Sequence, residues 1–518
     1  MASPTGPAEH AEQGVAFPAG ADGRASTMAV NQAVFVDAVA ATDPGVGDVL
    51  RAEDAWRERY AEHIRTLIEV GMRSDAHAMS ISRDGLASVR RRMLFRRGAE
   101  ESGIDEAMAT YADRALGTAV VTGFGARMRR DFCVPYHGQA LVGADLRRQL
   151  DDWVGRGIAE PSFADALALV IDNPDWLDLS DQAVAVLGAG SQMGPLRQLC
   201  EWGADVWALD LPRAQVWARV LATARAGSGR MMVPVPAGHP SAGSAVDEAD
   251  DAALAEVAGG NVITDTPEVL AWLRTIEGPL TVGNYVYADG GVHVRASVAI
   301  DAVMTGLAGR GDPLMLAFLA TPTDVFSVPA AVVDDARRRY DDSGLPGTLL
   351  GRPMNRLSGR RVFEPHYAAS TYRDHDRTFG IADNLVVRQG PNYALAKRMQ
   401  RWRASVAREE GTTASLNIAP PTRTRSVVKN RMFALAYAGM GRFGLEVFEP
   451  ETSNALMAGM LVHDLRNPRS TAHPDVALGH PLDLFVDGAN PGGMWRSPYE
   501  PNSIMAAAAV AGLFEGRA

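Results

Sequence analysis

The stretch at residues 183–210 constrains the fold more than any other part of the chain. It begins with the apolar run AVAVL, which is typical of a buried parallel strand. The glycine turn GAGSQMG follows, then a helical pattern, PLRQLCEWG, and a second apolar run that ends at Asp210. A strand, a turn, a helix and a second strand in this order form a βαβ unit. We therefore predict an α/β fold with a Rossmann-type doubly wound parallel sheet.

The glycine turn and the acid that follows it have the spacing of a dinucleotide site. Gly188, Gly190 and Gly194 permit a tight turn and let a pyrophosphate approach the backbone at the helix N-terminus. Asp210 lies about twenty residues after Gly190, where a carboxylate accepts hydrogen bonds from a ribose 2′-hydroxyl. Because this carboxylate repels a 2′-phosphate, NAD is the predicted cofactor and NADP is less favoured. The nearby positive charge of Arg213 favours NADP and so weakens this preference.

Strand and helix patterns continue to alternate after this unit. GGNVITDTPEVLAWLRTI predicts a strand, a turn at Asp265 and a helix, and residues 279–290 predict a strand that ends in a second glycine turn. A helix at 293–307 and a strand at 314–319 follow. Such alternation favours an open parallel sheet, in which ligands bind at the carboxyl ends of the strands.

The rest of the chain divides around this region. Residues 1–28 are predicted to be a disordered lead-in, and residues 29–175 show the helical period throughout, so we expect an additional, mostly helical N-terminal region. The nucleotide-binding domain is placed at 176–470, with insertions near 227–260 and 328–392. Residues 471–518 form a C-terminal extension.

Composition excludes several classes of function. A net charge of -11 without a basic stripe argues against nucleic-acid binding. No apolar run is long enough to cross a membrane. Two cysteines in 518 residues indicate a reducing, cytoplasmic location rather than a disulfide framework. No histidine cluster has the spacing of a metal site, so no metal is predicted.

Lysine is scarce, and its position is informative. The chain has only two lysines, Lys397 and Lys429, and Lys397 follows Tyr393 by four residues in a strong helical pattern. Residues spaced i, i+4 lie on one helix face. An ammonium beside a phenol favours the phenolate, so we expect Lys397 to lower the pKa of Tyr393 and to make it a proton donor and acceptor.

These motifs together resemble the short-chain dehydrogenase/reductase superfamily. LGAGSQMG at 187–194 is similar to its glycine turn, with Leu187 for threonine and Gln192 for the middle glycine. Tyr393 and Lys397 match its Tyr-x-x-x-Lys pair. Ala-Asp-Gly at 288–290 and the strand with its proline turn at 415–424 match two further elements. The resemblance implies a homo-oligomer and the following cofactor-binding residues: Gly188, Gly190, Ser191, Met193, Gly194, Asp210, Asp265, Ala288, Gly290 and Pro420.

The chain departs from the family at two points. The family's catalytic serine has no counterpart about a dozen residues before Tyr393. Thr321, at the end of the 314–319 strand, is the favoured replacement, and Thr323 and Ser370 remain alternatives. The assisting asparagine is missing, because no asparagine occurs between Asn284 and Asn355.

The resemblance implies an NAD(P)(H)-dependent oxidoreductase that interconverts an alcohol and a ketone. The hydride then comes from the nicotinamide and the proton from Tyr393, assisted by Lys397. The two insertions favour a roomy pocket and a bulky, apolar small-molecule substrate. Two alternatives stay open: a dehydratase or epimerase with tightly bound NAD, and a non-catalytic NAD-binding regulatory protein.

Overall fold

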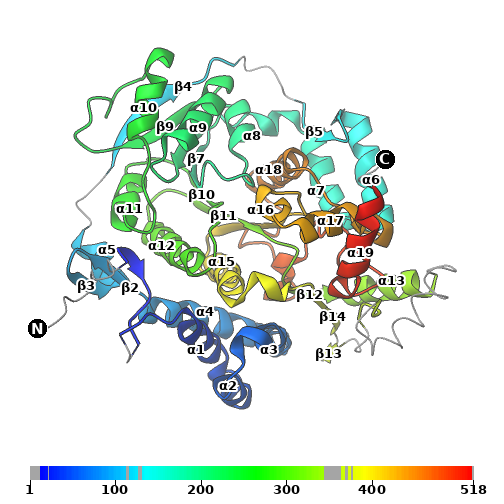
Figure 1. Ribbon diagram of the computed structural model, residues 1–518. Coiled ribbons are helices and arrows are strands. Elements are labelled where there is room, and N and C mark those ends of the chain that lie inside the picture. Colours follow the sequence, from blue (N-terminus) through cyan, green and yellow to red (C-terminus); the bar gives the residue numbers. More distant parts are fainter. Residues whose placement is uncertain are drawn as a thin grey trace, which may run out of the picture.

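A seven-stranded sheet forms the centre of the protein. The computed structural model describes residues 12–20, 23–111, 116–125, 131–342, 363–367, 372–374 and 377–515. The sheet has the order β15-β11-β10-β7-β8-β9-β4 (Figure 1). Six of its strands are parallel: β7 (Ala183–Leu187), β8 (Asp205–Leu209), β9 (Arg230–Val235), β10 (Leu280–Asn284), β11 (Leu314–Ala320) and β15 (Thr413–Ile418).

The strand order is compatible with a Rossmann-like fold. Counted along the chain, the six parallel strands lie in the order 3-2-1-4-5-6, so the order reverses between β7 and β10. Leu187 at the end of β7 is level with Leu209 of β8 and Asn284 of β10. The loops after these three strands therefore leave the sheet side by side. The predicted α/β class is confirmed.

Both faces of the sheet are covered by apolar side chains, as expected for strands with few polar positions. Val184 and Val186 belong to one cluster, with residues of α8 (Leu196–Glu201), α9 (Ala214–Ala226) and α18 (Pro450–Arg466). Ala185 and Leu187 belong to the other, with α11 (Thr266–Arg274), α12 (Gly291–Leu307) and α15 (Pro391–Glu409). This alternation follows from the period of two along a strand.

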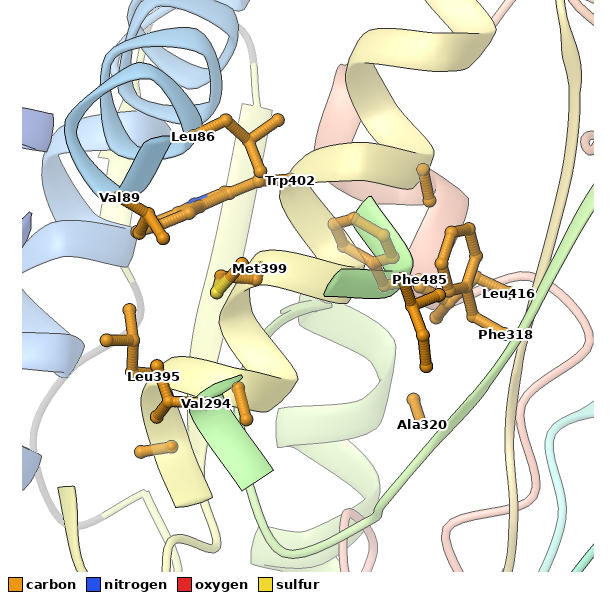
Figure 2. Close-up of a cluster of buried hydrophobic side chains, with 14 of the residues drawn as sticks. Leu86, Val89, Val294, Phe318, Ala320, Leu395, Met399, Trp402, Leu416 and Phe485 are labelled. Carbon is orange, nitrogen blue, oxygen red and sulfur yellow. The ribbon is translucent and has the colours of Figure 1, made fainter. Parts of the chain in front are cut away.

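Three N-terminal helices, α1 (Thr27–Ala40), α3 (Trp56–Gly71) and α4 (Asp75–Arg92), pack on α15, and α2 (Pro44–Arg51) packs on α1. Figure 2 shows Trp402 of α15 against Leu86 and Val89 of α4. A Cβ on Gly85 would lie 2.5 Å from the Trp402 ring, so only glycine permits this approach. The buried side chain of Asn31 donates to the carbonyl oxygen of Pro391 at 2.8 Å, which fixes the first turn of α15.

The N-terminal region is less purely helical than the sequence predicts. It contains β2 (Leu94–Arg97), β3 (Glu100–Gly103), α5 (Ile104–Thr110), β4 (Gly117–Thr122), β5 (Cys133–Tyr136), β6 (Gln139–Val142), α6 (Gly143–Arg156) and α7 (Pro161–Asp172). Strand β4 pairs antiparallel with β9 and forms one edge of the central sheet. Its partner lies more than a hundred residues away, so no local pattern reveals the pairing. The lead-in also contains β1 (Gly14–Ala16), paired with β2, whereas residues 1–11 lie outside the described residues.

Two further predictions are corrected. The insertion at 227–260 contains β9, a strand of the central sheet, and α10 (Asp251–Val257). Pro234 disfavours a strand assignment there, but the pairing of β9 with β8 ends at Met232, so Pro234 lies where only β4 pairs with β9. The strand expected at NVIT is a turn instead, because the Asp265 carboxylate accepts from the N–H of Asn261 at 2.8 Å.

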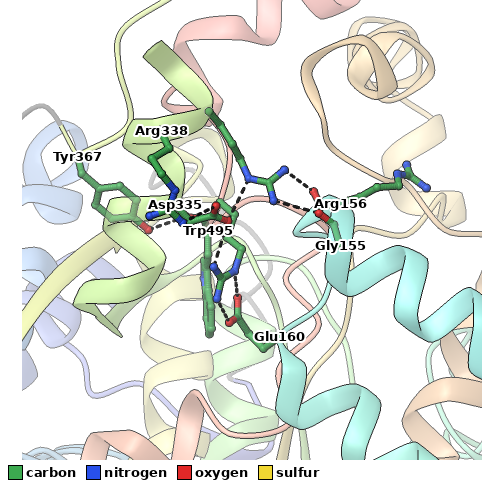
Figure 3. A network of polar contacts seen from close by, with 9 residues as sticks. Gly155, Arg156, Glu160, Asp335, Arg338, Tyr367 and Trp495 are labelled. Atoms are coloured by element: carbon green, nitrogen blue, oxygen red, sulfur yellow. Dashed lines mark hydrogen bonds and ion pairs between the residues drawn. The ribbon is translucent and has the colours of Figure 1, made fainter. Parts of the chain in front are cut away.

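The second insertion, at 328–392, holds most of a small sheet. β12 (Val325–Pro329) pairs with β14 (Arg377–Asp383), which pairs with β13 (Tyr372–Asp374), and α13 (Ala330–Asp341) follows β12. Figure 3 shows the polar network that ties α13 to the end of α6. Arg496 joins Glu160 at 2.6 Å and Asp335 at 3.1 Å.

Besides α18, three described α-helices follow β15. α16 (Arg425–Val428) and α17 (Arg431–Gly439) come directly after the sheet, and α19 (Pro501–Glu515) packs on α17. A Cβ on Gly439 would lie 2.0 Å from the carbonyl oxygen of Ala508, so α17 and α19 approach closely. Among the described residues, no helix combines the length and the hydropathy needed to span a bilayer.

Candidate functional site

A cavity of about 500 Å³ lies at the carboxyl ends of β10, β11 and β15. Its lining comes from six parts of the chain: the glycine turn after β7, the loop after β10, the residues at and after the end of β11, Gln389 in the turn before α15, helix α15 itself, and the segment from the end of β15 to α17. Eight of the predicted site residues line this cavity: Ser191, Met193, Ala288, Gly290, Thr321, Tyr393, Lys397 and Pro420.

Tyr393 and Lys397 reach the cavity from the first two turns of α15. The helix begins after Gly390, whose φ of 83° favours glycine. The Lys397 ammonium donates to the carbonyl oxygen of Leu319 at 3.1 Å and to Oε1 of Gln400 at 3.3 Å. Both acceptors are neutral. The Leu319 contact attaches the lysine to β11, two residues before Thr321.

Burial, rather than the Lys397 ammonium, sets the direction in which the pKa of the Tyr393 phenol shifts. It raises the pKa of Tyr393, while a hydrogen bond with Thr321 acts in the opposite direction. The pKa is therefore not lowered as the Tyr-Lys spacing predicts. Burial also lowers the pKa of Lys397 to about 8, against the attraction of Asp324. At neutral pH both groups hold their protons.

Thr321 is one member of a short chain of hydrogen bonds. Its hydroxyl lies 2.8 Å from that of Thr323, and Nε2 of Gln389 donates to Oγ1 of Thr323 at 3.1 Å. Since Gln389 supplies a donor, Thr323 can donate onward to Thr321. Gln389 lines the cavity and was missed from the sequence, because nothing in its spacing indicates a role. Ser370, the other alternative, lies outside the described residues.

The glycine turn keeps two backbone donors available. Gly190 donates to Oδ2 of Asp210 at 2.7 Å, and Gly194 donates to Oδ1 of Asn454 at 3.2 Å. In the part of the chain that the structure describes, no hydrogen bond uses the N–H groups of Gln192 and Met193. Both residues line the cavity. The side chain of Gln192 accepts from the N–H of Arg425 at 2.8 Å.

Five predicted cofactor residues do not line the cavity: Gly188, Gly190, Gly194, Asp210 and Asp265. Gly188 has a φ of 91°, and a Cβ there would lie 2.9 Å from the backbone of Tyr285. Each oxygen of Asp210 accepts one backbone N–H, from Gly190 and from Leu211, and burial raises its pKa. These residues shape the turn that carries Ser191 and Met193.

A buried ionic cluster supports the reactive side of α15. Asp324 accepts from Arg398 at 2.6 Å and from Arg401 at 3.0 Å, and all three side chains are buried. The Arg401 guanidinium lies 4.4 Å from the ring centres of Phe326 and Phe485. The cluster fixes α15 against the segment that follows Thr321 and Thr323.

His293, in the first turn of α12, packs behind the phenol. Its ring centre lies 5.6 Å from that of Tyr393 and 5.6 Å from that of Tyr287. The side chain is buried, and neither ring nitrogen has a hydrogen-bond partner among the described residues. Burial, with Lys397 nearby, lowers the pKa of His293 to about 3, so the ring is neutral.

Comparison with known proteins adds no assignment. No protein-family model matches the chain, and searches of curated proteins and of solved structures find no significant match. Within the described residues, no group of three or more His, Cys, Asp or Glu side chains is arranged to hold a metal ion. The site therefore has to be interpreted from its own chemistry.

Proposed function

We propose that the protein is an NAD(P)(H)-dependent oxidoreductase of the short-chain dehydrogenase/reductase type, with a doubly wound Rossmann domain, and that it interconverts an alcohol and a ketone. One observation carries the proposal. Tyr393, Lys397 and Thr321 line a single cavity at the carboxyl ends of parallel strands, together with the glycine turn. The strand order and the apolar clusters on both sheet faces support the fold.

The residues present fit a nicotinamide dinucleotide. The N–H groups of Gln192 and Met193 are suited to a pyrophosphate, because consecutive backbone donors bind phosphate oxygens well. The order of strands reverses between β7 and β10, which is where dinucleotides bind in such sheets. Asp210 retains lone pairs for a ribose hydroxyl beside its two backbone bonds, and its negative charge favours NAD over NADP.

The bound nicotinamide supplies or accepts the hydride. Tyr393 gives its proton to the carbonyl oxygen, and Thr321 donates a hydrogen bond that holds this oxygen or the phenolate. The Lys397 ammonium, on the same helix face, stabilises the phenolate that forms. Because burial raises the pKa of Tyr393, the phenol is protonated at neutral pH, which favours reduction of the carbonyl compound.

A screen at the nicotinamide absorbance band tests this function. Wild-type protein is given NADH or NADPH with a panel of aldehydes and ketones, and oxidation of the cofactor is followed. We expect turnover with NADH in preference to NADPH. Thr321→Val should lower kcat by about a hundredfold or more, since it removes a donor to the reacting oxygen. Saturable NADH binding without turnover of any compound would contradict the enzyme assignment.

A further inference from the structure

The two lysines of the chain meet in the same cavity. Among the described residues, 28 line it, and they include both Lys397 and Lys429. Elsewhere the chain uses arginine for its basic residues. Lysine presents a compact charge with three donors, and it differs from arginine in how it binds anions. The placement of both lysines at one cavity indicates a selected role for each.

Lys429 acts together with Arg425. The N–H of Lys429 donates to the carbonyl oxygen of Arg425 at 3.2 Å, so the two residues are one helical turn apart. Residues at this spacing share a face, and both residues, which are exposed to solvent, line the cavity. The N–H of Arg425 is bonded to Gln192, which holds this turn against the glycine turn.

The positive charge of this wall is not neutralised by the protein. In the described part of the chain, neither Arg425 nor Lys429 forms an ion pair, whereas Arg423 in the same segment is paired with Glu449 at 3.4 Å. Among the described lining residues, Asp289 is the one that carries a carboxylate, and it accepts from the hydroxyl of Tyr287 at 3.2 Å. These described residues therefore include three cationic ones, Lys397, Arg425 and Lys429, and one acidic one.

We propose that the substrate carries an anionic group, a carboxylate or a phosphate, that Arg425 and Lys429 bind while its carbonyl lies at Tyr393. This inference rests on the proposed oxidoreductase function and names its substrate class. It differs from the apolar substrate expected from the insertions. The pyrophosphate of the cofactor is a second possible anion, but Gln192 and Met193 already offer two backbone donors for it.

Lysine acylation measures anion binding at Lys429 directly, because the chain contains only two lysine side chains. The full-length protein, saturated with NADH, is treated with an acetylating N-hydroxysuccinimide ester, and the rate at Lys429 is followed by peptide mass spectrometry. The probes are 4-oxopentanoate and its methyl ester, which differ in charge but little in shape. We expect the acid at saturation to slow acylation of Lys429 by about tenfold, in proportion to occupancy, and the ester to have little effect.

Two variants serve as a matched pair. Arg425→Gln should raise about tenfold the concentration of the acid that gives half-maximal protection of Lys429, because a charge-assisted hydrogen bond is lost. Arg423→Gln removes an exposed arginine from the same segment outside the cavity and should leave the protection unchanged. Equal protection by acid and ester, or none by either, would overturn the proposal. Full protection by NADH alone would overturn it too, since the cations would then serve the cofactor.

Acylation of Lys429 with and without NADH, compared with NADH binding and ketone reduction, separates this inference from the proposed function. If the acid protects Lys429 without NADH, and NADH shows no saturable binding, the anion site stands and the oxidoreductase assignment fails. If NADH binds and neutral ketones are reduced at the same rate as the corresponding keto acids, the oxidoreductase assignment stands and the anion site fails.

Discussion

The two halves of the sheet's carboxyl edge are built differently. In the glycine-turn half, after β7 and β8, two polar side chains hold the turn: Asp210 accepts two N–H groups, and Asn454 bonds both Gly194 and Gln192. Among the described residues, only the backbone N–H groups of Gln192 and Met193 in this turn stay available to a ligand. In the reactive half, around α12 and α15, several buried polar atoms find no partner among the described residues. They belong to His293, Asn384, Asn392, Arg398, Gln400 and Arg401.

This difference separates residues that shape the site from residues that are available for chemistry. Buried polar groups in proteins are nearly always hydrogen-bonded, so each exception requires an explanation. Asp210 is the residue that the βαβ pattern singles out, yet its side chain is used to hold the turn. The reactive half retains Tyr393 and Lys397 in a cavity with neutral partners. Unpaired polar groups are tolerated there because α15 is anchored elsewhere, by Asp324 and the N-terminal helices.

The largest expected effect is on that anchor. Asp324→Asn leaves the buried guanidinium groups of Arg398 and Arg401 without a counter-charge, so the free energy of unfolding should fall by about 3–5 kcal/mol. Asp205→Asn, which breaks the partly exposed pair between Asp205 on β8 and Arg230 on β9, is the control and should cost less than about 1 kcal/mol. Denaturant unfolding measures both. If Asp324→Asn and Asp205→Asn lose the same amount of unfolding free energy, the distinction between the two halves is removed.

In the glycine-turn half, Asp210→Ala should affect folding and binding together. The N–H groups of Gly190 and Leu211 lose their acceptor, which should lower the free energy of unfolding by about 1–3 kcal/mol. The affinity for NADH should fall as well, because the turn that carries Ser191 and Met193 loosens. Chemical denaturation and NADH fluorescence titration give the two quantities. Unchanged stability would show that the carboxylate does not hold the turn.

The stability should also depend on pH through Lys397. Its pKa is about 8 in the folded protein, against 10.5 when unperturbed. Between these values the unfolded chain binds more protons, so the Lys397 contribution to stability rises with pH from about 8 to 10.5. Below pH 8 the buried ammonium destabilises the fold to its full extent. Lys397→Met should therefore be most stable relative to wild type below pH 8, and this advantage should shrink in alkali. If the difference in unfolding free energy between Lys397→Met and wild type does not change with pH, the Lys397 ammonium is not buried as described.

The smallest effect concerns His293. His293→Leu replaces an imidazole that has no hydrogen-bond partner among the described residues with an apolar side chain of similar size. We expect the free energy of unfolding to rise by about 1 kcal/mol, since a desolvated polar group is removed. Thermal unfolding compares this variant with wild type. A loss of stability would indicate that the imidazole has a role in the fold.

Local patterns predicted the parts of the structure that depend on short stretches of sequence. The strands at 183–187 and 314–319 and the helix that carries Tyr393 all follow from neighbouring residues. The meeting of Tyr393, Lys397 and Thr321 followed from spacing together with the resemblance.

What the sequence could not predict depends on distant contacts. The pairing of β4 with β9 and the contact of Asn31 with Pro391 join residues that are far apart in the chain. Gln389 belongs to the site only because β12 and β14 bring it beside Thr323. The pKa of Tyr393 was predicted in the wrong direction, because burial cannot be read from a helix spacing.

The most direct test of the account is to remove one hydroxyl from the reactive half. Tyr393→Phe should retain NADH binding within about twofold, because the cofactor contacts lie elsewhere, while carbonyl reduction should fall by at least about a hundredfold. Tyr437→Phe removes another hydroxyl from the same cavity and should leave turnover nearly unchanged. If Tyr393→Phe reduces the substrate at the wild-type rate, the phenol is not the proton donor and the account is wrong.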